Sequence, residues 1–281
     1  MSRLVLLTGS TGFVGRQLLR HLEDKGFSVR LVVRTGSSND LFGKPCIESV
    51  IRSNNMFLED EDWWKAACHG VDTVLHAAWY AEPGVYLQSP LNMVCLQGTL
   101  RLASGAVLAG VRRFVGLGTC FEYDLAEGVL SIETPLRPLT TYAGAKAAVF
   151  MALQPSLVQQ GVEFAWCRLF YLFGEGEDER RLVPFLRSML SSGRYAELTS
   201  GDQIRDFLDV KEAAQMIVKV TIGNFQGAVN ICSGKPVTVR ELAEEIADEY
   251  GRRDLLKFGA RKDNLTDPKC VLGIPNLDLL G

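Results

Sequence analysis

Short runs of apolar residues alternate with longer stretches of helical periodicity from the first residues of this chain. Runs rich in valine, leucine and isoleucine are typical of buried strands, and they predict strands at 3–8, 28–33, 47–51, 71–78, 112–118 and 161–170. Apolar residues spaced three or four apart predict helices at 13–26, 59–70, 90–109 and 141–160. Strands separated by helices indicate an α/β fold with a doubly wound parallel sheet and right-handed crossovers.

The alternation weakens after residue 170. The segment "GEGEDERR" (174–181) is a charged loop, and the elements beyond it are shorter. We therefore predict two parts. Residues 1–170 form the sheet domain, to which residues 206–232 return with a last strand, "GAVNI". Residues 171–205 and 233–281 form a smaller C-terminal lobe that binds the substrate.

Composition narrows the class of protein. The chain has 281 residues, a net charge of -3 and dispersed basic residues, so we expect no nucleic-acid partner. No apolar run approaches the roughly 20 residues of a membrane helix, and "LVLL" is too short for a signal-peptide core, so we expect a cytoplasmic protein without a membrane partner. The seven cysteines are widely spaced and form no CxxC pair, which predicts reduced thiols and no metal site.

A glycine-rich segment, "LLTGSTGFVG" (6–15), joins the first predicted strand to the first helix. Glycines at this junction fold a tight turn and let backbone N–H groups approach a pyrophosphate at the helix N-terminus. The position favours dinucleotide binding over a plain strand-to-helix turn. The fold is therefore Rossmann-like. We expect the cofactor to contact Gly9, Thr11, Gly12, Phe13, Val14, Gly15, Arg34, Asn55, Ala77, Ala78 and Lys146.

The end of the second strand indicates which dinucleotide binds. An acidic residue there would hold the ribose 2′-hydroxyl of NAD(H), whereas a cation suits the 2′-phosphate of NADP(H). The strand ends in Arg34, the segment "TGSS" (35–38) follows with further hydroxyls, and neither Asp nor Glu stands in the place. The sequence therefore predicts NADP(H) over NAD(H). A surface arginine on a loop is the alternative.

Tyr142 and Lys146 in "YAGAK" stand four residues apart, so they share one face of a helix. A phenol has a pKa of about 10, and an adjacent ammonium lowers it toward the range useful for acid–base work. Thr119 ends a strand 23 residues earlier, at the edge where open α/β sheets bind ligands. We predict Thr119, Tyr142 and Lys146 as catalytic residues. Thr119 and Tyr142 would also hold the substrate oxygen, unless Thr119 only caps the strand.

These motifs resemble those of the extended short-chain dehydrogenases/reductases of the NAD-dependent epimerase/dehydratase superfamily. "TGSTGFVG" resembles the family's TGxxGxxG, "YAGAK" its YxxxK and "IRDFLDV" (204–210) its RDFxxV. "CLQGTLRLASGA" (95–106) resembles its NxxGTxxLLxAA helix with Cys95 in place of asparagine, and "RLFYLFG" (168–174) its RxFNxYG with Tyr171 in place of asparagine. The resemblance implies that Thr119 is the family's catalytic Ser/Thr.

The residues after Thr119 argue against one reaction of this family. Its sugar-nucleotide dehydratases place acids after the threonine, because loss of water needs a base and an acid. Here the two positions hold Cys120 and Phe121, which can do neither. Glu122 lies one position further; we expect its side chain to point away, yet include it among residues that line the substrate pocket.

The resemblance also implies a substrate site for a nucleotide-diphosphate sugar. Arg205 resembles the arginine that pairs with the diphosphate, and guanidinium suits phosphate oxygens. A salt bridge from Arg205 to Asp202 or Asp206 is the alternative on local sequence. The aromatic-rich segment "HAAWYAEPGVYL" (76–87) places Trp79, Tyr80 and Tyr86 near the sugar, although such clusters are more often core. We take His76 as structural.

Four functions remain open. The first is an NADPH-dependent reductase of a nucleotide-linked 4-keto-6-deoxysugar, with Tyr142 as the proton donor. The second is a nucleotide-sugar 4-epimerase with tightly held NAD. The others are a reductase of a non-nucleotide carbonyl, against which Arg205 argues, and a non-catalytic NADP(H)-binding protein, in which an intact Thr119–Tyr142–Lys146 set would be unexpected.

The resemblance further implies a homodimer. Its helices near 92–109 and 141–160 would form a four-helix bundle with those of a second copy. Pro155 lies inside the second helix, where proline removes a hydrogen bond, so we expect a break there.

Overall fold

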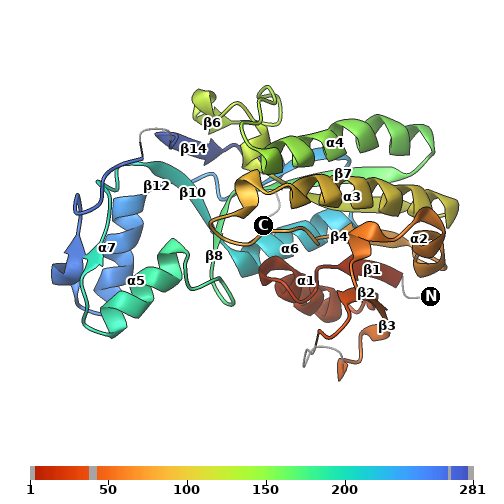
Figure 1. The fold of residues 1–281 in the computed structure, drawn as a ribbon, viewed down its shortest axis with the longest axis horizontal. Helices are drawn as coiled ribbons and strands as arrows, with labels where there is room; N and C mark the ends of the chain where they lie inside the picture. The colour runs from red at the N-terminus through yellow and green to blue at the C-terminus, as the bar shows by residue number, and fades with distance from the viewer. Residues whose placement is uncertain (1–3, 38–42, 265–266, 278–281) are drawn as a thin grey trace.

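The computed structural model describes residues 4–37, 43–264 and 267–277, which form a larger and a smaller lobe (Figure 1). The larger lobe contains a sheet of seven strands, each running parallel to its neighbours. In chain order these strands are β1 (Leu4–Thr8), β2 (Ser28–Arg34), β3 (Ile47–Ser53), β4 (Thr73–His76), β5 (Arg113–Thr119), β7 (Glu163–Leu169) and β11 (Gly227–Ile231). Across the sheet their order is β11-β7-β5-β4-β1-β2-β3.

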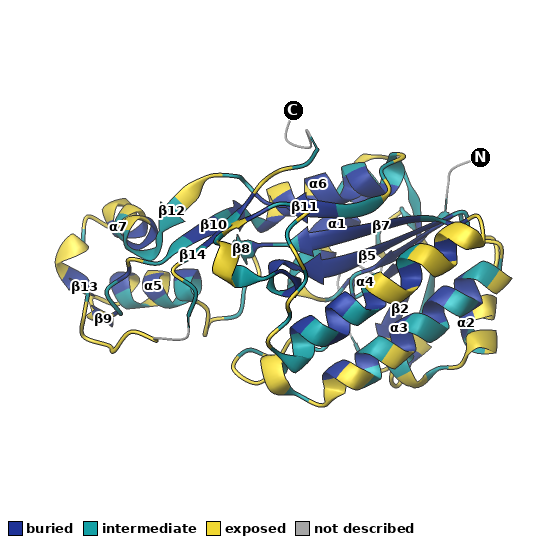
Figure 2. Ribbon diagram, turned by 90° about the horizontal axis from the view of Figure 1, so that it is seen from above, coloured by how far each residue is buried: buried dark blue, intermediate teal, exposed yellow. Residues whose placement is uncertain are grey.

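Helices cover both faces of this sheet. One face carries α1 (Phe13–Asp24) and α6 (Val210–Ile222), and the other carries α2 (Glu61–Ala67), α3 (Leu91–Leu108) and α4 (Thr141–Gln159) (Figure 2). Strands buried on both faces read as continuous apolar runs, which is why the sequence pattern identified them. The predicted Rossmann-like, doubly wound fold is confirmed.

The order of the strands places a crevice at the middle of the sheet. The chain builds β1, β2 and β3 toward one edge and then returns to place β4 on the other side of β1. Connections that leave neighbouring strands in opposite directions open a crevice beyond their carboxyl ends, where such sheets bind ligands. The glycine loop follows β1 at this point.

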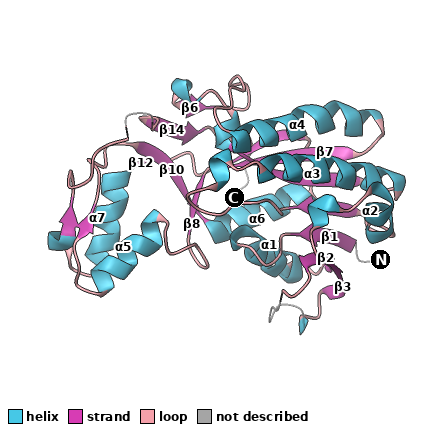
Figure 3. Ribbon diagram, viewed as in Figure 1, coloured by secondary structure: helices cyan, strands magenta, loops and turns pink. Residues whose placement is uncertain are grey.

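The smaller lobe joins short strands to two helices (Figure 3). Its helices α5 (Leu182–Ser191) and α7 (Val239–Glu249) pack together over an apolar core. Its strands are β6 (Val129–Leu130), β8 (Tyr171–Phe173), β9 (Ala196–Glu197), β10 (Ile204–Asp209), β12 (Pro236–Thr238), β13 (Leu256–Lys257) and β14 (Cys270–Gly273). Strand β10 lies at the centre of this lobe's larger sheet, between β12 and β14, and also pairs with β8.

Two segments differ from the division made on the sequence. Strand β6 falls within residues 1–170, yet it pairs with β14 of the smaller sheet. Residues 206–209 belong to β10 and thus to the same small sheet, whereas β11, at the end of 206–232, pairs with β7 at the edge of the large one. Two-residue strands carry no periodicity, so the sequence pattern could not place them.

Helix α4 runs without a break through Pro155 (Figure 3). The expected break is therefore wrong. Pro155 lies on the exposed side of the helix, where water can satisfy the carbonyl group that loses its amide partner. The rest of α4 is held in place by its buried face against the sheet.

Helix α3 requires a second correction. Its 18 residues have a mean hydropathy of 1.2, so by length and composition it qualifies as a membrane span, contrary to the expectation that no stretch approaches that length. Of this window 44% is buried inside the structure, where the helix packs between α2 and α4 on the sheet. An apolar helix in that position is equally typical of a protein core.

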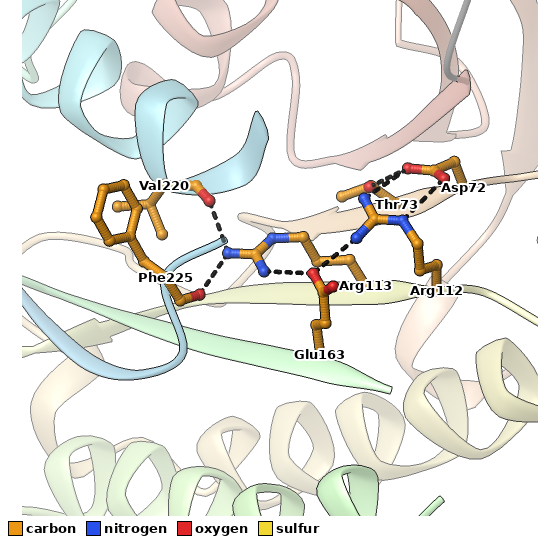
Figure 4. Close-up of polar contacts among 7 residues, drawn as sticks. All are labelled: Asp72, Thr73, Arg112, Arg113, Glu163, Val220 and Phe225. Atoms are coloured by element: carbon orange, nitrogen blue, oxygen red, sulfur yellow. Dashed lines mark hydrogen bonds and ion pairs between the residues drawn. The ribbon is translucent and has the colours of Figure 1, made fainter. Parts of the chain in front are cut away.

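Arg113 is the first residue of β5 and is fully buried, at the end of the strand opposite the crevice. Figure 4 shows its polar contacts. Its guanidinium donates to Glu163 at 2.8 Å and to the backbone carbonyls of Val220 and Phe225. Arg112, beside it, pairs with Asp72 and Glu163 but is 38% exposed. This network joins β5 and β7 to the end of α6 and lies outside the functional site.

Candidate active site

A cleft of about 1000 Å³ begins at the glycine loop and continues into the smaller lobe. Its cofactor end is lined by Gly9, Gly12, Phe13, Val14, Gly15, Arg34, Asn55 and Ala77. Thr119, Tyr142 and Lys146 line its middle, and Arg205 lies at the substrate end. The cleft thus brings together predicted residues that are far apart in the sequence.

The glycine loop has the geometry of a pyrophosphate site. A side chain on Gly15 would stand 1.9 Å from the carbonyl oxygen of Gly9, and one on Gly9 would meet the backbone of Ala78 at 2.7 Å. Gly9 also has a φ of +74°, which favours glycine. Gly12 caps α1 with no side-chain hydrogen bond, so the first N–H groups of the helix remain available to an anion in the cleft.

Two expected cofactor contacts do not line this cleft. The backbone N–H of Ala78 donates to the Thr8 hydroxyl at 3.2 Å, which turns the segment after β4. Thr11 uses its carbonyl to accept from Arg16.

Arg34 lies at the carboxyl end of β2, is exposed and lines the cleft beside Asn55. Its side chain forms no ion pair within the part of the chain that the structure describes. Ser38 of the "TGSS" segment lies outside the described residues. The side chain of Asn55 accepts from the N–H of Phe57 and so caps the short turn that follows.

Thr119 ends β5 and begins a helical turn, Cys120–Glu122. Its hydroxyl oxygen accepts from the N–H of Phe121 at 3.3 Å, so Thr119 caps the turn that follows the strand. The Thr119 hydroxyl also interacts with the side chain of Tyr142, and Thr119 lines the cleft while only 6% exposed. Capping and substrate binding are therefore compatible in this residue.

The glycines of β5 make room for a tryptophan. Side chains on Gly116 or Gly118 would stand 2.3 Å from the ring of Trp166 on the neighbouring strand β7. The indole therefore packs directly against the carboxyl-terminal half of β5, next to Thr119.

Tyr142 stands in the first turn of α4, which Thr140 caps, and faces the cleft beside Thr119. Two aromatic rings meet it edge-on, Tyr86 at 4.9 Å and Trp79 at 6.4 Å between ring centroids. Burial under these rings raises the pKa of Tyr142, and its interaction with the Thr119 hydroxyl acts in the opposite direction. The expected lowering of the Tyr142 pKa is therefore wrong for this arrangement, because desolvation exceeds any effect of Lys146.

Lys146 lies one turn further along α4 and is 4% exposed. Its ammonium donates to the carbonyl of Leu117 at 2.6 Å and lies 3.9 Å from the centre of the Trp79 ring. Burial lowers the pKa of Lys146 to about 7, while the charge of Glu122 raises it. The ammonium retains a further donor for a ligand in the cleft, which Lys146 lines.

Glu122 does not line the substrate pocket, so that prediction is wrong. Its carboxylate is fully buried and accepts from the N–H of Thr119, the indole of Trp166 and the guanidinium of Arg168. The turn after Thr119 directs the Glu122 side chain toward Trp166 and Arg168 on β7, away from the cleft, as the spacing had indicated. Cys120 and Phe121 do line the cleft; burial raises the pKa of the Cys120 thiol.

Arg205 lies in the cleft but has a carboxylate partner that sequence reasoning missed. Its guanidinium donates to Asp267 at 2.7 Å and lies 5.2 Å from the Tyr171 ring. The alternative partner Asp206 instead accepts from Ser233, Gly234 and Gly273 and anchors the small lobe. No local pattern joins Arg205 to a residue 62 positions away.

The segment after β4 supplies an aromatic wall. Trp79, Tyr80 and Tyr86 all line the cleft, and Asn92 fixes the Trp79 indole by accepting from it at 2.8 Å. Phe57 packs edge-on against Trp79 and was not foreseen. The structure also adds Tyr171 and Arg181 to the lining.

His76 is 3% exposed and lies between the hydroxyls of Thr8 and Thr99, at 2.8 and 3.0 Å. Burial lowers its pKa to about 3, so it is neutral. This geometry supports a structural role. In the described segments no three His, Cys, Asp or Glu residues come together to hold a metal.

A glycine loop on a doubly wound sheet, with threonine, tyrosine and lysine at its carboxyl edge, is characteristic of extended short-chain dehydrogenases/reductases. Over residues 5–232 the chain matches the NAD dependent epimerase/dehydratase family, and it belongs to that family. The predicted resemblance is confirmed.

Several relatives of this chain, and several solved structures similar to it, are nucleotide-sugar enzymes by name. The dTDP-6-deoxy-L-talose 4-dehydrogenase (NAD(+)) of Aggregatibacter actinomycetemcomitans is 23% identical, over 96% of this chain and 98% of the relative. The UDP-glucose 4-epimerase of Streptomyces lividans is 27% identical, over 88% of this chain and 80% of the relative. Among solved structures, the UDP-N-acetylglucosamine 4-epimerase of Methanobrevibacter ruminantium M1 is 22% identical with a TM-score of 0.86, over 99% of this chain and 92% of the other.

Proposed function

We propose that this protein is an oxidoreductase that reduces the 4-keto group of a nucleotide-linked 4-keto-6-deoxysugar with a reduced nicotinamide dinucleotide. One observation carries the proposal: Thr119, Tyr142 and Lys146 meet midway along a cleft that joins the glycine loop to Arg205. A cofactor at one end and a sugar nucleotide at the other would meet at this point.

The cofactor end fits a dinucleotide on its own geometry. Gly12 leaves the first N–H groups of α1 open to a pyrophosphate, and a side chain on Gly15 would collide with the loop. When bound, the nicotinamide supplies a hydride to the keto carbon. Solved relatives with this fold contain NAD, such as the UDP-glucose 4-epimerase of Thermus thermophilus.

The residues of the chain supply the proton and the orientation. Thr119 and Tyr142 both donate hydrogen bonds to the keto oxygen, which places the carbonyl in a single orientation. Tyr142 then transfers its proton to that oxygen as negative charge develops there. Lys146, held at the Leu117 carbonyl, directs its ammonium into the cleft and stabilises the phenolate that Tyr142 leaves behind.

Two observations support reduction at C4 over dehydration. Cys120 and Phe121 occupy the positions from which a dehydratase's acids would act, and the Glu122 side chain points away from the cleft toward Arg168. In addition, the 4-dehydrogenase among the relatives, by its name, oxidises the 4-hydroxyl of a 6-deoxysugar nucleotide, and this is the reverse of the proposed reaction.

The substrate end favours an anionic ligand that can compete for Arg205. A sugar-linked diphosphate would replace Asp267 as the partner of this guanidinium, since Asp267 is 36% exposed and sits at the cleft. Two-point contact with phosphate oxygens is stronger than the single contact that the carboxylate makes.

The second candidate is a 4-epimerase, which several relatives are by name. An epimerase oxidises and re-reduces the same carbon and consumes no cofactor. Both candidates are tested with a panel of UDP-, GDP-, CDP- and dTDP-linked sugars: the 4-keto-6-deoxyhexoses are incubated with the protein and NADPH or NADH, and the corresponding 4-hydroxy sugars are incubated with the protein alone. Loss of reduced cofactor in step with formation of the 4-hydroxy product supports the reductase; interconversion of 4-hydroxy sugars with no added cofactor would identify an epimerase.

We propose NADP(H) as the preferred dinucleotide because Arg34, free of ion pairs among the described residues, can meet a 2′-phosphate. NADPH is expected to bind at least about tenfold tighter than NADH, a difference of about 1.4 kcal/mol. Arg34→Ala should abolish the difference while NADH affinity stays the same. Calorimetric titration of both cofactors measures this, and an unchanged ratio in the variant would refute the assignment.

We propose that α3 and α4 form the interface of a homodimer. Apolar side chains stand exposed on both helices: Leu91, Met93 and Leu108 on α3, and Met151 and Val158 on α4. Light scattering at micromolar concentration should give twice the chain's mass, and Met151→Glu should give a monomer because it buries an unpaired charge. A monomeric wild type would contradict the proposal.

A further inference from the structure

Glu122 is a buried carboxylate that the proposed reaction does not use directly. It is 0% exposed, and four hydrogen bonds reach its two oxygens. Oε1 accepts from the Thr119 N–H at 2.8 Å and from the Trp166 indole at 3.0 Å. Oε2 accepts from the same indole at 3.2 Å and from Arg168 Nε at 2.8 Å. A charge this well satisfied is held in a single position.

The Glu122 carboxylate is linked to the catalytic residues through its hydrogen-bond partners. It accepts from the backbone of Thr119, and the indole that bonds to it has its ring 5.7 Å from the Lys146 ammonium. Its charge raises the pKa of Lys146 against the larger effect of burial, and it adds to burial in raising the pKa of Tyr142. Both effects favour the protonated form of the group.

The other groups that act on the pair are neutral at neutral pH. His76 has a pKa of about 3, and burial raises the pKa of the Cys95 and Cys120 thiols and of the Tyr86 phenol. Among the described groups that act on the pair, Glu122 is therefore the one that carries negative charge.

The positive partner of Glu122 is Arg168, whose guanidinium makes further contacts. Arg168 Nη1 donates to the Tyr123 hydroxyl, and the guanidinium lies between the rings of Tyr123 and Phe150. Of the two charges of this buried ion pair, that of Glu122 is the one that acts on the pKa of Lys146.

We propose that Glu122 is a positioning residue that fixes the backbone of Thr119 and keeps Tyr142 and Lys146 in their protonated, proton-donating forms. The inference rests on the proposed function, because a reductase needs a proton donor at this site whereas an oxidising enzyme needs a base. Glu122 would thus favour the protonation state of the site that reduction requires.

The direct test follows the titration of Lys146 in the protein without substrate or cofactor. Lysines labelled with carbon-13 at Cε are observed by NMR, and the Lys146 signal is identified by its loss in Lys146→Met. The wild-type midpoint should lie near pH 7. In Glu122→Gln it should fall by about one pH unit, the size expected of a unit charge several ångströms away in a protein interior.

Two further variants separate charge from folding. Glu163 forms an ion pair with Arg113 at the amino ends of β7 and β5 (Figure 4). Glu163→Gln removes the negative charge of that pair and should leave the Lys146 midpoint unchanged. Glu122→Val with Arg168→Leu removes the buried pair as a unit, which is often tolerated. The midpoint should fall in this double variant too, so it decides the question if Glu122→Gln does not fold. An unchanged midpoint in the folded variants would overturn the proposal.

The enzymatic arm keeps this inference separate from the proposed function. In Glu122→Gln the alkaline limb of kcat/KM for reduction should move to lower pH by about one unit, since that limb reports loss of the proton donor. If the protein reduces no sugar nucleotide but Lys146 shifts as expected, the proposed function fails and the role of Glu122 stands. If reduction occurs but neither the alkaline limb of kcat/KM nor the Lys146 titration midpoint moves, the proposed role of Glu122 is wrong.

Discussion

Tyr142→Phe is expected to lower kcat for reduction by about 10²–10⁴-fold, the usual contribution of a positioned proton donor. Phenylalanine keeps the ring that packs against Trp79 and Tyr86 and removes only the hydroxyl group. Binding of the reduced cofactor should therefore be nearly unchanged. The measurement is a comparison of single-turnover rates and cofactor affinity in the two proteins.

Thr119→Val serves as the matched variant. It removes one hydrogen bond to the keto oxygen and the cap on the turn that follows, but no proton donor. The loss in kcat should therefore be smaller than in Tyr142→Phe. If the two losses were equal, or if Tyr142→Phe retained wild-type kcat, Tyr142 would not be the proton donor.

Arg113→Met is expected to lower the free energy of unfolding by about 3–5 kcal/mol, as breaking a buried charged network does. The variant removes a guanidinium with 0% exposure and leaves the carbonyls of Val220 and Phe225 without their donor (Figure 4). Urea unfolding measures the loss as a lower midpoint at an unchanged slope.

Arg112→Met is the control for this prediction. Arg112 pairs with Glu163 as Arg113 does, but it is 38% exposed, so its loss should cost about 0–1 kcal/mol. If both variants lowered the free energy of unfolding by a similar amount, burial would not explain the contribution of Arg113 to stability.

The sequence predicts those parts of the fold and site that depend on local spacing. The apolar runs identified the large sheet because its strands are buried on both faces. The glycines at 9, 12 and 15 and the four-residue spacing of Tyr142 and Lys146 place their groups through the geometry of one turn and one helix. Such features need no knowledge of the rest of the chain.

The features that were missed depend on contacts between distant segments. Glu122 turns away from the pocket because Trp166 and Arg168, on a neighbouring strand, donate to it. Asp267 reaches Arg205 across the smaller sheet. The raised pKa of Tyr142 likewise depends on how deeply the assembled cleft buries the ring, which spacing along one helix does not determine.

The most direct test of the account is a transfer experiment with NADPH that carries deuterium at both hydrogen positions of nicotinamide C4. The protein is incubated with this cofactor and a nucleotide-linked 4-keto-6-deoxyhexose, and the product is examined by mass spectrometry and NMR. The account predicts one deuterium at C4 of the sugar for each cofactor oxidised, with Tyr142→Phe slowing its appearance. A product formed without deuterium, or a sugar with an intact 6-hydroxyl that loses water in the presence of oxidised cofactor, would contradict it.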